Sequence, residues 1–355
     1  MSLEDLRKQV DEMDERLVKL IAERTRVTRE IGKEKREIGK PIEDKSREQI
    51  VMGKVKTLAR AENLNPEDIE KIYQRIFFSS KEVQGVTVAF QGEVGAYSEE
   101  AAFQYFGPGS RIIPHESLEE VFQAVEKGQV QYGLVPVENS LEGIIARTYD
   151  LLLDSVLKVC GETQLRIVHC LIGLPDSRID SIKEVYSHPQ ALGQCKNFLN
   201  KMGWKLVPSY DTAGSVKFIK ESGTTEKAAI ASARSAEIYS MKILVHGIED
   251  NTQNYTRFFV LCKQDTGPTG DDKTSIVFSV KHKPGALYDV LKELAARKIN
   301  LTKIESRPTR QKPWEYNFYV DFEGHYQDPI IKEALQSLEN AAIFVKVLGS
   351  YPKLK

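Results

Sequence analysis

The sequence lacks the features that mark several large classes of protein. It has only four cysteines in 355 residues and no CxxC pair, which excludes the common zinc and dithiol redox motifs. No apolar run approaches the ~20 residues that a membrane span needs, and the first ten residues lack the basic start and apolar core of a signal peptide. The 50 basic and 51 acidic residues leave a net charge of −1, which disfavours nucleic acid or an acidic membrane as a partner. These absences predict a cytoplasmic protein with reduced thiols.

Composition divides the chain into three regions. Of the first 83 residues 37 are charged, and only three of the 23 glycines lie there, a composition typical of long helices. A second break lies at 264–272, which is polar and rich in glycine and so reads as a linker. We therefore expect domains at 1–84, 85–264 and 271–355.

The first region predicts three helices. Apolar residues follow a spacing of three to four from Leu3 to Ile31, so a helix from Leu3 to about Lys35 would be roughly 50 Å long. A second helix is expected from about Ile42 to Ala61, and Asn65-Pro66 is a good start for a third. Two shorter helices cannot cover so long an apolar face, so we expect a dimer formed through this region.

Arg24 interrupts that apolar face, where a cation must meet a glutamate of a neighbouring helix or an anionic ligand. Lys35 lies three helical turns later on nearly the same face, which favours the ligand. Arg7 projects about 100° away and would reach a neighbouring chain more naturally.

The middle region alternates strands and helices, which predicts an α/β sheet. The runs Gly133–Pro136 and Ala228–Ala231 are continuously apolar, as in a buried parallel sheet. Gly92-Glu-Val-Gly95 would be either an anion-binding loop at a helix N-terminus or a tight turn. The third region reads as strand, helix, strand, strand, helix, strand, the ferredoxin-like order.

Polar positions of the first region resemble the all-helical class of chorismate mutases. They include Ala22-Glu-Arg24, Gly32-Lys-Glu-Lys35 and Pro41-Ile-Glu-Asp-Lys-Ser-Arg-Glu48. The resemblance implies rearrangement of chorismate to prephenate in an electrostatically organised site, without a nucleophile. In that site Lys35 and Gln84 would contact the ether oxygen, and Arg7 would come from the other subunit. The implied chorismate-binding residues are Arg7, Arg24, Lys35, Asp44, Arg47, Glu48, Ser80 and Gln84.

The middle region resembles the prephenate dehydratases, with two α/β lobes similar to periplasmic binding proteins and a site in their cleft. The resemblance is carried by Gly95-Ala-Tyr-Ser98, Glu138-Asn-Ser140, Ser187-His-Pro-Gln190 and Tyr255-Thr-Arg-Phe258. It implies that Thr256 contacts the hydroxyl that leaves prephenate and that Arg257 binds a carboxylate. His188 is either a general acid or, more in keeping with its motif, a turn residue. The implied prephenate-binding residues are Tyr97, Ser98, Asn139, Ser140, Ser187, Gln194, Thr256, Arg257 and Phe258, and Ala96 and Leu141 depart from the family pattern.

Residues 273–350 resemble the ACT regulatory domain through Lys283-Pro-Gly-Ala-Leu287 and Ile304-Glu-Ser-Arg-Pro308. The resemblance implies that phenylalanine binds between two such domains and inhibits by favouring a less active dimer. The implied contacts are Gly285, Ala286, Leu287, Asn300, Leu301, Glu305 and Ser306.

The order of the three regions is that of the bifunctional chorismate mutase–prephenate dehydratases, which implies no cofactor and no metal. Two alternatives stay open: a mutase fused to a ligand sensor without catalysis, and a mutase fused to a dehydrogenase. The retained Thr256-Arg257-Phe258 argues against the first, and the lack of a nicotinamide fingerprint argues against the second. Whether the dimers pair into tetramers is also left open.

Overall fold

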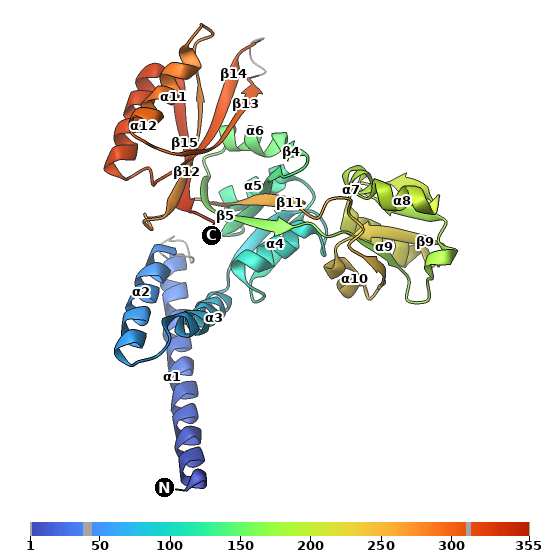
Figure 1. Cartoon of the computed structure of the whole chain (residues 1–355), viewed down its shortest axis with the longest axis horizontal. Helices are drawn as coiled ribbons and strands as arrows, with labels where there is room; N and C mark the ends of the chain where they lie inside the picture. Colours follow the sequence, from blue (N-terminus) through green and yellow to red (C-terminus); the bar gives the residue numbers. More distant parts are fainter. Residues whose placement is uncertain (1, 38–44, 310–313, 355) are drawn as a thin grey trace. The chain divides into compact units, whose positions relative to one another are not determined.

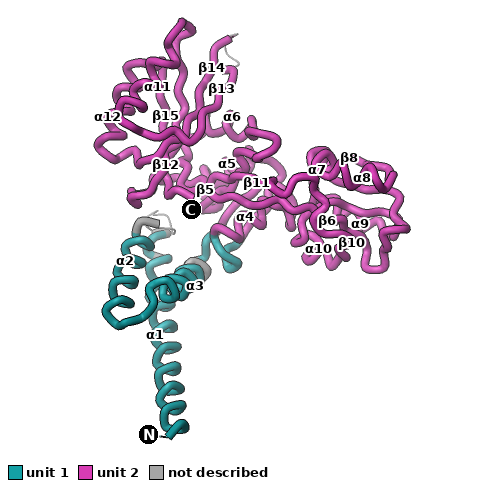
Figure 2. The backbone as a smooth tube through the Cα atoms, in the orientation of Figure 1, with its two compact units in different colours: residues 1–86, 106–111 teal, residues 87–105, 112–355 magenta. Residues whose placement is uncertain are grey.

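The computed structural model describes residues 2–37, 45–309 and 314–354. It divides the chain into two compact units, which Figure 2 shows in two colours. The first comprises residues 1–86 and 106–111, and the second comprises 87–105 and 112–355. Each is described by itself below, and the boundaries expected at 84, 264 and 271 stay a prediction.

The first unit contains three helices, α1 (Leu3–Glu37), α2 (Lys45–Ala61) and α3 (Pro66–Gln84). The start of α3 is as expected, because the backbone N–H of Glu67 donates to Asn65 Oδ1 at 3.0 Å. The start expected for the second helix, Ile42, lies outside the described residues. Among the described residues nothing covers the N-terminal part of the apolar face of α1, since Leu6, Met13, Leu17 and Leu20 are 47–62% exposed.

The second unit begins with a lobe built on a mixed sheet in the order β2-β1-β3-β11-β5. Its elements are β1 (Thr87–Gln91), α4 (Tyr97–Phe106), β2 (Arg111–His115), α5 (Leu118–Glu126), β3 (Tyr132–Asn139), β4 (Gly143–Ile144), α6 (Ala146–Asp154), β5 (Lys158–Arg166) and β11 (Tyr255–Cys262). The strand β3 is parallel to β1 but antiparallel to β11, so the wholly parallel sheet expected around Gly133 is not found. The reason is that β11 returns from the second lobe and inserts between β3 and β5 in the opposite direction.

The second lobe carries a five-stranded sheet in the order β10-β6-β9-β7-β8. Its elements are β6 (Cys170–Gly173), a short 3₁₀ turn η1 (Ile179–Ser181), β7 (Glu184–Ser187), α7 (Pro189–Gln194), α8 (Lys196–Met202), β8 (Lys205–Pro208), α9 (Thr212–Ser222), β9 (Lys227–Ala231), α10 (Ala233–Tyr239) and β10 (Lys242–His246). Here too the sheet is mixed, because β9 is parallel to β7 and antiparallel to β6. Two α/β lobes joined by crossing strands confirm the expected fold class for this region.

Residues beyond 271 form the expected ferredoxin-like arrangement, with strand order β13-β14-β12-β15. Its elements are β12 (Asp272–Ser279), α11 (Ala286–Ala296), β13 (Leu301–Pro308), β14 (Tyr316–Glu323), α12 (Pro329–Ala341) and β15 (Phe344–Pro352). The two helices cover one face of the sheet (Figure 1). Apolar side chains such as Phe278, Val290 and Leu338 fill the space between them.

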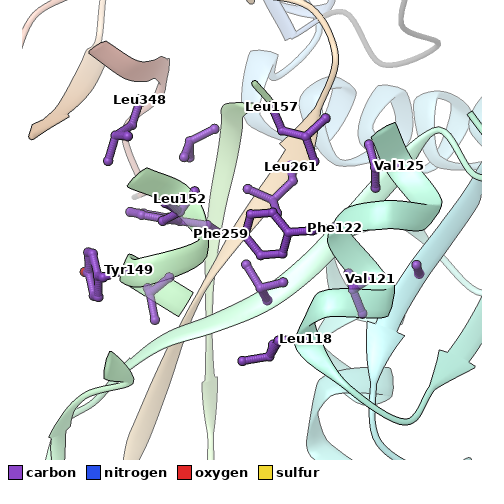
Figure 3. Close-up of a cluster of buried hydrophobic side chains, with 14 of the residues drawn as sticks. Leu118, Val121, Phe122, Val125, Tyr149, Leu152, Leu157, Phe259, Leu261 and Leu348 are labelled. Atoms are coloured by element: carbon purple, nitrogen blue, oxygen red, sulfur yellow. The ribbon is translucent and has the colours of Figure 1, made fainter. Parts of the chain in front are cut away.

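The other face of this sheet packs against the first lobe. Val277, Tyr319, Leu348 and Tyr351 belong to one buried cluster with Phe259 of β11 and other side chains of the lobe. Figure 3 shows Leu348 of β15 in the same cluster as Leu152, Phe259 and Leu261. The two sheets therefore share a hydrophobic core.

Gly349 allows a close approach of β15 to β5 at this junction. A Cβ atom built on Gly349 would lie 2.1 Å from the carbonyl oxygen of Val159 in β5. Only a residue without a side chain fits there.

Candidate functional site

A cavity of about 530 Å³ lies in the second unit and is lined by residues of both lobes. Polar side chains line it from β1, β3, β11, α4 and α7, from the turn before α9, and from the segments that follow β3 and β5. They are Gln91, Tyr97, Ser98, Asn139, Glu142, His169, His188, Gln190, Gln194, Tyr210, Asp211, Thr212 and Thr256. The expected residues Tyr97, Ser98, Asn139, Gln194, Thr256 and Phe258 are thus brought together.

Thr256 and Asn139 are direct partners across the β11–β3 ladder. Asn139 Nδ2 donates to Thr256 Oγ1 at 3.1 Å, while Asn139 Oδ1 accepts from the backbone N–H groups of Leu141 and Glu142. These two acceptor contacts fix the orientation of the amide. Because Thr256 Oγ1 accepts from Asn139, its own hydrogen is directed elsewhere, and the hydroxyl can donate to a molecule in the cavity.

A chain of hydrogen bonds links Asn139 to the second lobe. Asn139 Nδ2 donates to Asn254 Oδ1 at 2.8 Å, and Asn254 Nδ2 donates to Gln194 Oε1 at 2.9 Å. His169 Nε2 lies 2.9 Å from the same Gln194 oxygen, and its Nδ1 lies 2.8 Å from Tyr97 Oη. Since the glutamine oxygen only accepts, His169 carries its proton on Nε2, and the single hydroxyl hydrogen of Tyr97 lies between His169 Nδ1 and the carbonyl oxygen of Val168, 2.9 Å away. Burial lowers the pKa of His169, which keeps the ring neutral and this pattern intact.

Two other residues of the cavity cap helices. His188 Nδ1 accepts from the backbone N–H of Gln190 at 3.3 Å at the start of α7, which agrees with its interpretation as a turn residue. Asp211 Oδ1 accepts from Gly214 N at 2.8 Å at the start of α9, and burial raises the pKa of this carboxyl group.

Three expected substrate contacts lie elsewhere. Ser187 is fully buried and donates to the carbonyl oxygen of Ile230. Ser140 Oγ bridges the backbone of Gln253 and Tyr255. Arg257 is directed away from the cavity, because successive side chains of a strand alternate between faces and Thr256 lies on the cavity side. This placement differs from the expectation that Arg257 binds a carboxylate of the substrate.

Arg257 instead contacts groups at the junction of the two sheets. Its guanidinium lies 2.7 Å from Glu162, 2.7 Å from Asp321 and 3.1 Å from Tyr351 Oη. Burial alone would lower the pKa of Arg257, but these neighbouring groups raise it above its ordinary value. The guanidinium is therefore a permanent cation in a buried network.

A second cavity, of about 400 Å³, lies between α1 and α3 in the first unit. It is lined by Ile21, Arg24, Thr25, Ile72, Arg75, Ile76, Ser79 and Ser80. Arg24 donates to Ser80 Oγ at 2.5 Å, and no glutamate lines this cavity among the described residues. Two arginines beside apolar side chains suit an organic anion.

The remaining expected residues of that site do not appear in the lining of this cavity. Lys35, Arg47 and Glu48 lie outside the cavity lining, and Arg7 is exposed on the N-terminal part of α1. Asp44 and the side chain of Gln84 lie outside the described residues.

A hollow of about 160 Å³ lies near the start of α11 and includes Ala286 and Leu287. Gly285 precedes that helix with a φ of +83°, a conformation that glycine adopts without strain. The other expected contacts, Asn300, Leu301, Glu305 and Ser306, lie on or next to β13 and do not line this hollow.

The glycine loop after β1 is a turn. Its two glycine amides are already bonded, Gly92 N to the carbonyl of His115 and Gly95 N to Glu99 Oε2. The two glycine amides are therefore not available to an anion, which favours the tight-turn alternative.

Sequence reasoning missed His169, Tyr210, Asp211 and Arg75. Asp211 had a usable signal, since a polar residue after a strand and before a helix is a typical cap. His169 had none, because its partners Tyr97 and Gln194 are far away in the sequence.

The described residues contain no group of three histidine, cysteine or acidic side chains placed to share a metal ion. Nor does any helix in the described ranges have the length and apolar character to cross a membrane.

Three family models match the chain in succession. They are "Chorismate mutase type II" at residues 6–85, "Prephenate dehydratase" at 88–266 and "ACT domain" at 274–340.

Relatives match over nearly the whole length. A bifunctional chorismate mutase/prephenate dehydratase of Aquifex aeolicus is 38% identical, covering 99% of this chain and 98% of the relative. Among solved structures, a prephenate dehydratase from Arthrobacter aurescens in complex with L-Phe is similar at a TM-score of 0.70 and 30% identity. That match covers 76% of this chain and 90% of the other. A quorum-quenching acylase, GqqA, also reaches a TM-score of 0.70, at 33% identity, with 76% and 98% covered.

Proposed function

Because the chain belongs to the bifunctional chorismate mutase/prephenate dehydratases, we propose specific roles for the side chains of its two cavities. The protein is an enzyme with both activities, and an ACT domain follows the two catalytic domains in the chain. It rearranges chorismate to prephenate and converts prephenate to phenylpyruvate, a reaction sequence of phenylalanine biosynthesis.

In the dehydratase reaction prephenate loses its ring carboxylate as CO₂ and its ring hydroxyl as hydroxide, which takes up a proton from solvent to give water. The electron pair of the breaking C–C bond enters the ring, which becomes aromatic as the C–O bond breaks. Thr256 donates a hydrogen bond to the departing oxygen, where negative charge grows. The observation that carries this role is the Asn139–Thr256 hydrogen bond, which leaves the threonine hydrogen available on the cavity side.

The test is Thr256→Val, which keeps the shape of the side chain and removes its hydroxyl. We expect kcat for phenylpyruvate formation to fall by roughly 100-fold, as for loss of other transition-state donors. Thr256→Ser is the matched control and keeps most of the rate, and mutase activity is unchanged in both. Full turnover by Thr256→Val would contradict this role. It would also make an acylase activity, as named for the similar structure GqqA, a reaction to assay.

In the mutase site, Arg24 binds a carboxylate of chorismate, with Ser80 holding the guanidinium in place. Arg75 of α3 adds a second cation to the same cavity. Lys35, Arg47, Glu48, Asp44 and Gln84 complete the site in the roles expected by resemblance. Arg24→Ala is expected to abolish most mutase turnover and to leave phenylpyruvate formation from prephenate intact.

A second copy of the chain covers the apolar face of α1 and supplies Arg7 to the mutase site. The support is the row of exposed leucine, valine and methionine side chains along this helix. Leu17→Glu is expected to convert a dimer to a monomer in sedimentation analysis and to lower mutase activity. Glu15→Gln, on the same helix, is the control.

Phenylalanine binds to the ACT domain and inhibits the dehydratase reaction. The support is the matching ACT family model and the similar dehydratase solved with L-Phe. In one dimer, the start of α11 from one copy and β13 from the other would together form the site. If a saturating concentration of L-phenylalanine leaves the rate of phenylpyruvate formation unchanged, the proposed inhibition through the ACT domain is wrong.

The cytoplasm is the proposed location. Its support is that Cys170, Cys195 and Cys262 are buried thiols that form no disulfide. Fractionation of producing cells tests it.

A further inference from the structure

Two pairs of oppositely charged residues face each other where the ACT sheet meets the first lobe. Glu138 and Arg257 are direct partners across β3 and β11. Lys303 and Asp321 are direct partners across β13 and β14. Each pair combines one acidic and one basic side chain, so each sheet presents both signs of charge to the other.

The two pairs are joined crosswise. Lys303 Nζ lies 2.6 Å from Glu138 Oε2, and Arg257 Nη1 lies 2.7 Å from Asp321 Oδ2. The side chains of Arg257 and Asp321 are 16% and 5% exposed, so solvent screens their contact little, whereas Glu138 is 36% exposed and its contact with Lys303 is screened more. Asp321 Oδ1 also accepts from Ser275 Oγ at 2.6 Å, which fixes the carboxylate within its own sheet.

The residues next to this quartet in sequence are those of the dehydratase cavity. Asn139 follows Glu138 on β3, and Thr256 precedes Arg257 on β11. Because side chains alternate along a strand, the quartet and the Asn139–Thr256 pair lie on opposite faces of the same two strands. A displacement of Glu138 or Arg257 therefore changes the backbone that holds the catalytic hydroxyl.

We propose that Lys303 and Asp321 of the ACT domain are positioning residues of the dehydratase reaction, which hold β3 and β11 in the register that orients Thr256. The proposal rests on the role given above to Thr256. It also gives a physical route by which a ligand on β13, the strand that carries Lys303, changes turnover.

Two other sets of contacts at the same junction lie away from the catalytic strands. Arg307 of β13 lies 2.9 Å from Asp150 of α6, and Lys346 Nζ donates to the carbonyl oxygens of Leu152, Leu153 and Ser155. None of these partners belongs to β3 or β11. The junction thus offers a comparison between ion pairs that adjoin the catalytic strands and one that does not.

The experiment measures phenylpyruvate formation by the full-length chain carrying Asp321→Asn, Lys303→Met or Asp150→Asn. We expect kcat to fall by between about 10-fold and 100-fold in the first two, as for other misplacements of a catalytic group, with KM and mutase activity little changed. Lys303→Arg, which keeps the charge, restores most of the rate. Asp150→Asn removes an ion pair of the same kind at the same junction and keeps the native kcat.

A double-mutant cycle separates positioning from mere stability. If Asp321 acts through the Asn139–Thr256 hydrogen bond, its substitution costs little more in a chain that already carries Asn139→Ala. Additive losses, a native kcat in Asp321→Asn or Lys303→Met, or an equal loss in Asp150→Asn would each overturn the proposal. Should Asp321→Asn not fold, Lys303→Met and Lys303→Arg decide the question alone. If the role proposed for Thr256 is itself wrong, the Thr256→Val variant shows this separately by keeping full turnover.

Discussion

Asn139 determines where the hydrogen of the Thr256 hydroxyl lies. Its amide nitrogen donates to Thr256 Oγ1, and its oxygen is held by two backbone N–H groups, so the amide cannot turn over without losing both. A threonine is a weak acid, and its value in the cavity comes from this orientation rather than from its acidity. The orientation of the Thr256 hydroxyl toward the cavity therefore depends on the hydrogen bond from the Asn139 amide.

Asn139→Asp tests that dependence with almost no change in shape. A carboxylate has no hydrogen to donate, so Thr256 would turn its own hydrogen toward residue 139 and away from the substrate. We expect kcat of the dehydratase to fall at least about 100-fold. Steady-state kinetics on prephenate and chorismate make the comparison, and an unchanged dehydratase rate would refute the orientation argument.

His169 makes the stability of the two-lobed domain sensitive to acid. Burial lowers its pKa in the folded protein below the ordinary value of 6.5, so the unfolded chain binds the proton more tightly. The stabilisation by the neutral ring is complete above pH 6.5 and is lost as the pH falls toward the folded pKa. Thermal unfolding of the native chain and of His169→Gln should show a smaller loss between pH 7.5 and 5.5 in the variant. Parallel curves for the two proteins would contradict this.

The strands β3 and β11 carry separate tasks on their two faces. The motif Thr256-Arg257-Phe258 is interpreted above as supplying two substrate contacts, although alternation along a strand places Thr256 and Arg257 on opposite faces. What pattern alone does not provide is the partner of Arg257, since Asp321 lies 64 residues later. Contacts between distant strands depend on how whole sheets pack, and the local spacing of residues does not predict that packing.

Gly349 sets how closely β15 approaches β5. Gly349→Ala would place a Cβ 2.1 Å from a backbone oxygen, so one strand must move. We expect a loss of about 1–3 kcal/mol in unfolding free energy. Gly193→Ala is the control, because an added Cβ there meets nothing within 4 Å and α7 gains a better helix former. Chemical denaturation measures the unfolding free energy of both variants, and equal stability of the two would contradict the steric argument for Gly349.

The order of domains followed from composition and motifs, but the way the last two associate did not. The polar stretch at 264–272 resembles a flexible linker, which suggests independent folding. In the structure, Phe259 and Leu261 of one domain are buried with Leu348 and Tyr351 of the other. Apolar residues in strands look the same whether they face their own domain or its neighbour, so sequence patterning could not separate the two cases.

A chain shortened after residue 264 should show the consequence of this shared core. It would leave Phe259, Leu261 and the buried Glu162 without their covering sheet. We expect the truncated dehydratase to unfold at a lower temperature than the full chain and to aggregate, while its α1–α3 region stays helical. Differential scanning calorimetry and limited proteolysis check this, and an unchanged dehydratase transition would show that the core is not shared in solution.

The crosswise ion pairs also limit which ACT domains can be exchanged between such enzymes. Lys303 and Asp321 each find an opposite charge only because Glu138 and Arg257 occupy matching positions on β3 and β11. A tail grafted from a relative would have to bring the same signs to both positions or be accompanied by compensating changes in the catalytic strands. Over evolutionary time, the regulatory tail and the catalytic strands would therefore be inherited as a matched set.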